Sequence, residues 1–240
     1  MELKRYTALS FWEEIPKASY FLKKLLFRKR SETKLATPSI IREQCTGMPL
    51  NGRTVKSILF STDLALIENN DCDAILAVYP FAPSSKIMET IINFSGKPVI
   101  CGVGGGKTQG RKSIEMAVEA ERLGAGAVIV NQPFKNKDIK EMKKKINIPI
   151  ISSVSTTNFD FENRIRAGIT AFNITGGAQT LEILNFLKQN YPHIPCICTG
   201  GKSIEHIHQV IQLNTCAVVL TPPSNANLFK RIMQGYRETS

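Results

Sequence analysis

Short apolar segments alternate with longer amphipathic segments along the chain from residue 55 onward. The apolar segments are rich in Val and Ile and contain almost no polar positions. This pattern is typical of strands that are covered on both faces of a parallel sheet. Eight such segments are predicted as strands: Val55–Ser61, Asp73–Tyr79, Pro98–Val103, Ala127–Asn131, Pro149–Val154, Thr170–Thr175, Pro195–Thr199 and Cys216–Thr221.

The segments between and after these strands have the spacing of amphipathic helices. In Ser113–Leu123, Thr180–Asn190 and Ser203–Leu213, apolar residues recur every three or four positions and polar residues occupy the other face. Eight strands, each followed by a helix, match the (β/α)8 barrel, or TIM barrel, in number and length. An open, doubly wound sheet is the alternative, but it requires no particular number of strands. We therefore predict that residues 55–240 form an eight-stranded parallel TIM barrel.

Residues 1–54 lie outside this repeat and are predicted to form an N-terminal helical extension and a connecting loop. Ser10–Arg30 has apolar residues along one side of a helix, and Pro16 marks its first turn or an interruption. Such a helix could close the bottom of the barrel or pack on a second subunit of a homo-oligomer. The alternative is a helix that lies on anionic lipid. Thr33–Arg53 is predicted as the loop that leads to the first strand.

Polar residues and glycines follow the predicted strands, and in this fold the ligand site lies at that end of the barrel. Strands six and seven end in Thr175-Gly176-Gly177 and Thr199-Gly200-Gly201. Glycines at the start of a helix allow backbone N–H groups to approach an anion closely. We predict a phosphate site formed by Gly176, Gly177, Gly200, Gly201, Lys202 and Ser224. The alternative is that Gly-Gly only makes a tight turn.

A third glycine-rich turn follows strand three, where Gly104, Gly105 and Gly106 precede Lys107 and Thr108. A phosphate-binding P-loop would also require a glycine at position 101, where the chain has Cys101. The turn is therefore predicted to contact an anionic substrate, with the three glycines as substrate-binding residues.

Few residues at the strand ends are suited to acid–base chemistry. Asp63 follows strand one and is predicted as the general base, with a helix N-cap as the alternative role. Lys107 is predicted as the catalytic cation, acting as an acid, a carbonyl polariser or an imine-forming amine. Asn131, Ser153 and Asn173 are predicted to orient the substrate or bind an oxyanion. The histidines lie away from the strand ends, and neither a metal site nor a cofactor is predicted.

The segment Ile-Cys-Thr-Gly-Gly-Lys-Ser at 197–203 resembles the turn after strand seven in the phosphate-binding TIM barrels. That superfamily includes thiamine phosphate synthase-like and ketodeoxyphosphogluconate aldolase-like enzymes, and the resemblance implies a phosphate at this turn. Two departures are present: strand eight leads to no glycine, and the Schiff-base lysine of the aldolases is missing from Phe172-Asn173-Ile174. The chain also resembles uncharacterised bacterial barrels labelled hydrolases and, more loosely, the glycerol-operon antiterminators, which bind RNA and a phosphorylated ligand.

Composition limits the classes of function. Apolar residues make up 42% of the chain, and no apolar run reaches the roughly 18 residues of a transmembrane helix. No signal peptide is predicted, and the scattered cysteines are typical of reduced thiols, so we expect a cytoplasmic location. The net charge of +11 favours anionic partners, with nucleic acid the less favoured one. The sequence predicts an enzyme, a lyase, isomerase or hydrolase, that acts on a small phosphorylated metabolite; the alternative is a phosphometabolite sensor or RNA-associated regulator.

Overall fold

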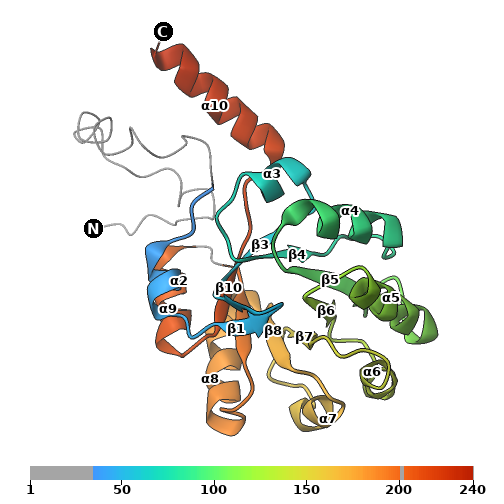
Figure 1. The fold of residues 1–240 in the computed structure, drawn as a ribbon. Coiled ribbons are helices and arrows are strands. Elements are labelled where there is room, and N and C mark those ends of the chain that lie inside the picture. The colour runs from blue at the N-terminus through green and yellow to red at the C-terminus, as the bar shows by residue number, and fades with distance from the viewer. Residues whose placement is uncertain (1–34, 201–202, 240) are drawn as a thin grey trace.

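Eight parallel strands close into a barrel in the computed structural model, which describes residues 35–200 and 203–239 (Figure 1). Consecutive strands pair in chain order, and the last pairs with the first through Val218 and Ser57. The predicted TIM barrel is confirmed. Its strands are β3 Ser57–Phe60, β4 Ala74–Ala77, β5 Val99–Gly104, β6 Ala127–Val130, β7 Ile150–Val154, β8 Ala171–Ile174, β9 Cys196–Thr199 and β10 Ala217–Leu220.

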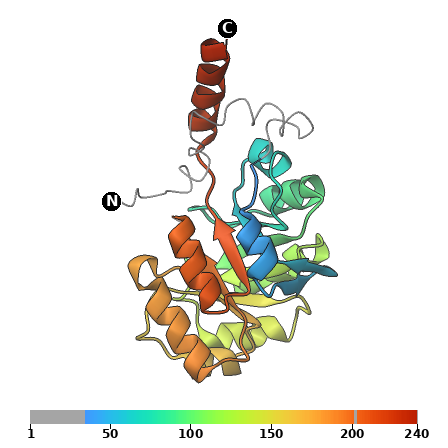
Figure 2. The ribbon, with the colours of Figure 1, turned by 90° about the vertical axis from the view of Figure 1, so that its left-hand side faces the viewer.

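A helix follows every barrel strand, and the short 3-10 helix η3 (Gly177–Gln179) precedes one of them. Figures 1 and 2 show most of these helices around the strands, whereas the last one, α10, projects away from the barrel. The helices are α3 Leu64–Glu68, α4 Ser85–Ser95, α5 Gly110–Arg122, α6 Asn136–Lys143, α7 Phe161–Arg166, α8 Thr180–Asn190, α9 Ile204–Gln212 and α10 Asn225–Thr239. No described helix is both long enough and apolar enough to cross a bilayer.

The segment Thr33–Arg53, predicted as a loop, holds a helix and a hairpin in its described part. Helix α2 (Ser39–Gln44) lies beside α9, and strands β1 (Met48–Leu50) and β2 (Arg53–Val55) pair antiparallel. Asn51 and Gly52 have positive φ angles of 48° and 71° in the turn between the strands. Asn-Gly is the preferred pair for such a tight hairpin turn, because both residues tolerate positive φ. The predicted helix Ser10–Arg30 lies outside the described residues.

The hairpin covers the bottom of the barrel, where the strands begin. Its side chains Met48, Leu50 and Val55 are at most 2% exposed and pack with the inward-facing residues of the strands. These inward residues are apolar at the lower levels of the barrel: Ile58, Ala74, Leu76, Ile100, Ala127, Ile129, Ile151, Ala171, Ile197, Ala217 and Val219. The lower interior is therefore a packed core with no room for a ligand.

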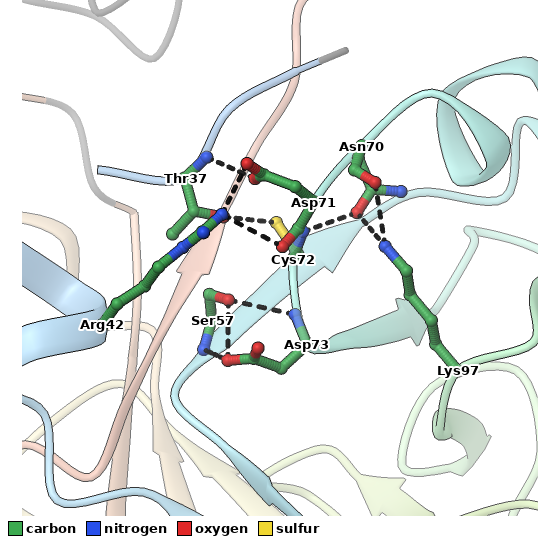
Figure 3. Close-up of polar contacts among 8 residues, drawn as sticks. All are labelled: Thr37, Arg42, Ser57, Asn70, Asp71, Cys72, Asp73 and Lys97. Atoms are coloured by element: carbon green, nitrogen blue, oxygen red, sulfur yellow. Dashed lines mark hydrogen bonds and ion pairs between the residues drawn. The ribbon is translucent and has the colours of Figure 1, made fainter. Parts of the chain in front are cut away.

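A polar network fastens β3 to β4 beside the hairpin (Figure 3). One carboxylate oxygen of Asp73 accepts hydrogen bonds from Lys56 N, Ser57 N and Ser57 Oγ, each 2.9 Å long. In return, Asp73 N donates to Ser57 Oγ at 3.0 Å. Ser57 is fully buried, so these bonds satisfy polar groups that water cannot reach.

The same network holds the start of the described chain. Asp71 forms an ion pair with Arg42 of α2 and accepts a hydrogen bond from Thr37 N. Lys97, just before β5, donates to the carbonyl and side-chain oxygens of Asn70 at 3.0 and 2.9 Å (Figure 3). The entry segment and the first three barrel strands are thus linked through a single turn, 70–73.

The six cysteines are buried and unpaired, as the sequence predicts for reduced thiols. Burial raises the pKa of the thiols of Cys45, Cys72 and Cys196 to about 11 and of Cys101, Cys198 and Cys216 to about 12. Because the thiolate is the reactive form, none of these residues is suited to act as a nucleophile near neutral pH.

We expect almost none of the cysteine thiols of the native protein to react with a disulfide reagent at pH 8. In the denatured protein, all six should react. The unfolded thiols ionise near their ordinary value of 9.0, well below the pKa of the buried thiols. The stabilisation from burying them protonated is therefore fully present below pH 9 and is lost as the pH rises towards 11 or 12. Fast reaction of the native protein would contradict this account.

The replacement Asp73→Ala should lower the free energy of unfolding by about 2–3 kcal/mol, because Ser57 N–H and its hydroxyl lose their acceptor inside the protein. Asp73→Asn keeps one acceptor oxygen and should cost less than half of that. Chemical denaturation of both variants measures the difference. Equal losses of stability in the two variants would show that the acceptor oxygen of residue 73 does not stabilise the fold.

Candidate functional site

The barrel interior becomes polar at the C-terminal ends of three neighbouring strands. Ser153 on β7, Asn173 on β8 and Thr199 on β9 are linked side chain to side chain. The Thr199 hydroxyl donates to Asn173 Oδ1 at 2.7 Å, and Asn173 Nδ2 lies 3.4 Å from Ser153 Oγ, to which it donates. Asn173 and Ser153 are 3% and 8% exposed, so their orientation is fixed by these bonds more than by water.

This polar layer brings two predicted substrate-binding residues together and adds a third. Because Ser153 Oγ accepts from Asn173, its own proton remains available for a ligand oxygen. Thr199 was predicted only as part of a glycine turn. Strand alternation could have revealed its role, because Ile197 faces the barrel core and the residue two positions later faces the same way.

A pocket of about 280 Å³ lies at the ends of β4, β5 and β6. Among the described residues, Lys107 is the only charged residue in its lining, and Val78 and Ile129 contribute apolar surface from the inner core. The predicted residues Gly104, Gly106, Lys107 and Asn131 all line this pocket. The remaining lining residues are Tyr79, Pro80, Phe81, Pro83, Gly102 and Thr108.

Tyr79 was not predicted as a site residue, although it ends the predicted strand Asp73–Tyr79. In the structure it follows β4 by two residues. Its phenolic oxygen accepts a hydrogen bond from Ser84 N at 2.8 Å, which fixes the ring at the pocket wall. The phenolic proton then remains for another acceptor, such as a ligand oxygen. Phe81 is 74% exposed at the rim, where an apolar ring is unusual unless something covers it.

The glycines at the end of β5 are required by packing. A side chain on Gly104 would collide with Ser113 and Phe134, and one on Gly105 would collide with the backbone of Asn131. Gly105 also has a φ of +92°, and its N–H donates to Thr108 O at 3.0 Å. The Gly105 N–H is therefore not available to a ligand. The loop places Gly106 and Lys107 at the pocket and, unlike a P-loop, does not wrap an anion with all of its amides.

Asp63, the predicted base, is the N-cap of α3. Its Oδ1 accepts hydrogen bonds from Ala65 N at 2.8 Å and Leu66 N at 3.3 Å. It does not line the pocket that contains Lys107. The geometry thus accounts for Asp63 as a helix cap, which was the alternative interpretation.

The predicted phosphate residues are only partly brought together. Gly177 and Gly200 line a second, more open cavity of about 710 Å³ with Thr199, Ser203 and Glu205. Gly176 instead packs against Ile183, and the Ser224 side chain accepts from Asn227 N at 3.3 Å at the start of α10. Gly201 and Lys202 lie outside the described residues.

No protein-family model and no curated protein matches the sequence. Solved structures do match the fold. A phosphoenolpyruvate phosphomutase from Streptomyces platensis subsp. rosaceus aligns with 14% identity and a TM-score of 0.57, over 75% of this chain and 80% of its own. A putative phosphonomutase from Burkholderia cenocepacia J2315 aligns with 12% identity and a TM-score of 0.59, over 84% and 98%.

A phosphonopyruvate hydrolase in complex with oxalate and Mg++ aligns with 12% identity and a TM-score of 0.57, over 77% of this chain and 80% of its own. At these identities the likeness shows the TIM-barrel fold alone. For the resemblance to phosphate-binding barrels, these structures likewise support the barrel fold and not the phosphate site.

A magnesium ion does not fit the pocket of this chain. Mg²⁺ prefers carboxylate and other oxygen ligands, whereas the charged group in the pocket lining is the Lys107 ammonium. Within the described part of the chain, no three His, Cys, Asp or Glu side chains lie close enough to share a metal ion.

Removing the Thr199 hydroxyl tests how much the polar layer contributes to the free energy of unfolding. Thr199→Val leaves Asn173 Oδ1 buried without a donor and should lower the free energy of unfolding by about 1–3 kcal/mol. Thr199→Ser retains the hydroxyl and should lose much less. Thermal unfolding of the two variants provides the comparison, and equal losses would mean that the methyl group, not the hydrogen bond, stabilises the layer.

Proposed function

We propose that this chain is an enzyme that acts on a small anionic metabolite, by lyase, isomerase or hydrolase chemistry, at the C-terminal end of its barrel. The observation that carries the proposal is the 280 Å³ pocket with Lys107 as the one charged residue in its described lining. Its volume suits a small metabolite, and the exposed Lys107 ammonium in its lining can form a charge-assisted hydrogen bond to an anion. The reduced, buried cysteines support a cytoplasmic location.

The polar groups at the mouth of the barrel, the end where its strands finish, suit a ligand with several oxygen atoms. Lys107, Asn131 and the Tyr79 hydroxyl supply donors on one side, at the ends of β4 to β6. The Ser153–Asn173–Thr199 layer continues the ring at β7 to β9, because β6 pairs directly with β7. Donors on both sides of the barrel axis could hold a carboxylate at one end and a carbonyl or phosphoryl oxygen at the other.

These groups also suit the proposed reaction types. Lyases, isomerases and hydrolases of this kind all develop negative charge on a substrate oxygen during the reaction. A fixed cation and oriented hydroxyl or amide donors stabilise that charge. We propose Lys107 as the catalytic cation and Tyr79 as a donor that can protonate a departing or developing oxyanion. Asp63 is assigned to the helix cap.

The names of the fold neighbours support a small anionic substrate. They include a phosphoenolpyruvate phosphomutase and a phosphonopyruvate hydrolase bound to oxalate. A second anion subsite at Gly177 and Gly200 is proposed for the phosphoryl group. Gly176, Gly201, Lys202 and Ser224 remain candidates from the sequence. The acidic Glu205 in the same cavity limits how much negative charge the subsite can accept.

A sensor or RNA-associated regulator is the second candidate, favoured by the surface of α6. Lys137, Lys140 and Lys143 are exposed on this helix, and Lys135, Lys144 and Lys145 flank it. Such a face can attract a polyanion. A regulator of this type would bind a small anion in the pocket without converting it, so turnover distinguishes the two candidates.

The replacement Lys107→Met should weaken binding of oxalate by about tenfold or more, because the pocket loses its charged hydrogen-bond donor. Calorimetric titration measures the affinity, and the melting temperature should stay unchanged because Lys107 is exposed. Lys107→Arg keeps the charge and should retain part of the affinity.

The matched control is Lys112→Met, which removes an exposed lysine of α5 that does not line the pocket. It should leave oxalate binding within about twofold of the original. If Lys112→Met and Lys107→Met weaken binding equally, the effect is one of overall charge, and the pocket assignment is wrong.

A further inference from the structure

Arg164 on α7 is a charged residue in the interior. Its side chain is only 3% exposed, and its guanidinium carbon lies 5.0 Å from the ring centre of Phe159. One of its nitrogens, Nη2, donates to the carbonyl oxygen of Gln132 at 2.8 Å. An arginine in this position differs from Arg166 on the same helix, which is exposed and pairs with Glu162.

No counter-charge neutralises Arg164 among the described residues. Its Nε and Nη1 atoms are buried without a hydrogen-bond partner, and no described carboxylate forms an ion pair with it. Burial lowers the pKa of the guanidinium to about 10, which leaves it charged near neutral pH. A buried charge without a counter-ion destabilises the fold. Replacing it by an apolar side chain of similar volume therefore usually leaves the free energy of unfolding unchanged or raises it.

The contacts of Arg164 lead to the ligand pocket. Arg164 donates its hydrogen bond to the carbonyl of Gln132. This residue immediately follows Asn131, which lines the pocket. The Gln132 side chain accepts hydrogen bonds from Ser155 N and Ser155 Oγ, at 2.8 and 3.0 Å. Ser155 follows β7, two residues after Ser153. The guanidinium therefore holds the turn that joins the pocket to the polar layer.

We propose that Arg164 is a positioning residue of the anion site, which fixes the turn at Asn131 and adds a permanent positive charge beneath it. The stacking on Phe159 and the single bond to Gln132 keep the guanidinium in place without neutralising it. Its charge is thus left to act on an anion in the mouth through a region of low dielectric. This inference rests on the proposed function, because it requires that the mouth bind an anion.

The test compares Arg164→Met with Arg166→Met in the full chain, using oxalate and inorganic phosphate as probes in calorimetric titrations. Both variants lose one positive charge from α7. Arg164→Met should weaken binding of the better probe by about fivefold or more, because the lost charge is buried. Arg166→Met should stay within about twofold of the original, because water screens an exposed charge.

Two further variants separate charge from hydrogen bonding. Arg164→Lys retains the charge and should recover most of the affinity, whereas Arg164→Gln keeps a donor for Gln132 O without the charge and should bind between Arg164→Met and Arg164→Lys. The melting temperature is the second readout. Arg164→Met should melt within about 5 °C of the original or above it, since the variant no longer buries an unpaired charge.

Each outcome has one meaning. Unchanged affinity in Arg164→Met, with clear binding by the original protein, overturns the role of Arg164 and leaves the proposed function standing. A fall of more than about 10 °C in melting temperature makes Arg164 a structural residue and also overturns the inference. If the original protein binds neither anion, the proposed function fails, and the inference fails with it.

Discussion

The structure depends on one constraint, which is that a closed eight-stranded barrel has an interior that its own side chains must fill. Alternate residues of every strand face inward, and at the lower levels they are apolar and tightly packed. The β1–β2 hairpin closes the remaining opening with Met48, Leu50 and Val55. Because apolar side chains fill the lower interior in this way, the polar layer of Ser153, Asn173 and Thr199 lies at the other end of the barrel.

The glycine turns illustrate how a motif can be conspicuous for a structural reason. Gly104 and Gly105 have no side chain because Ser113, Phe134 and the Asn131 backbone occupy the space. Gly176 is likewise packed against Ile183. The effect on function is indirect: close packing of the turn on β6 brings Lys107 and Asn131 to the same pocket.

Electrostatics divides the charged residues into two groups. Most ion pairs of the described chain lie on exposed helix surfaces, such as Arg122 with Glu119 and Lys144 with Glu141, where solvent screening makes them weak. Lys107 and Arg164 form no such pair with a described carboxylate. Lys107 is exposed but lines the pocket, where it can contact a ligand directly. Arg164 is buried beside the turn that shapes this pocket, so its charge is screened less by water.

Much of the fold follows from the sequence, because eight buried strands and eight amphipathic helices leave clear periodic patterns. The same patterns predicted a site at the strand ends, and they identified Lys107, Asn131, Ser153 and Asn173 as polar residues there. The hairpin was missed despite its Asn51-Gly52 signal, because its strands are only three residues long, which is too short for alternation to be recognised in the sequence.

Which residues meet was decided by the tertiary structure alone. The pairing of β8 with β9 sets Thr199 against Asn173, and the β5–β6 packing sets Lys107 beside Asn131, although neither pair is close in sequence. Local hydrogen bonds make Asp63 the N-cap of α3, and Asp63 does not line the pocket that contains Lys107. The burial of Arg164 has no sequence signal, because Phe161-Glu-Asn-Arg-Ile-Arg has the composition of an ordinary surface helix. Periodicity reports which way a side chain faces, but only the packing of distant segments determines what it contacts.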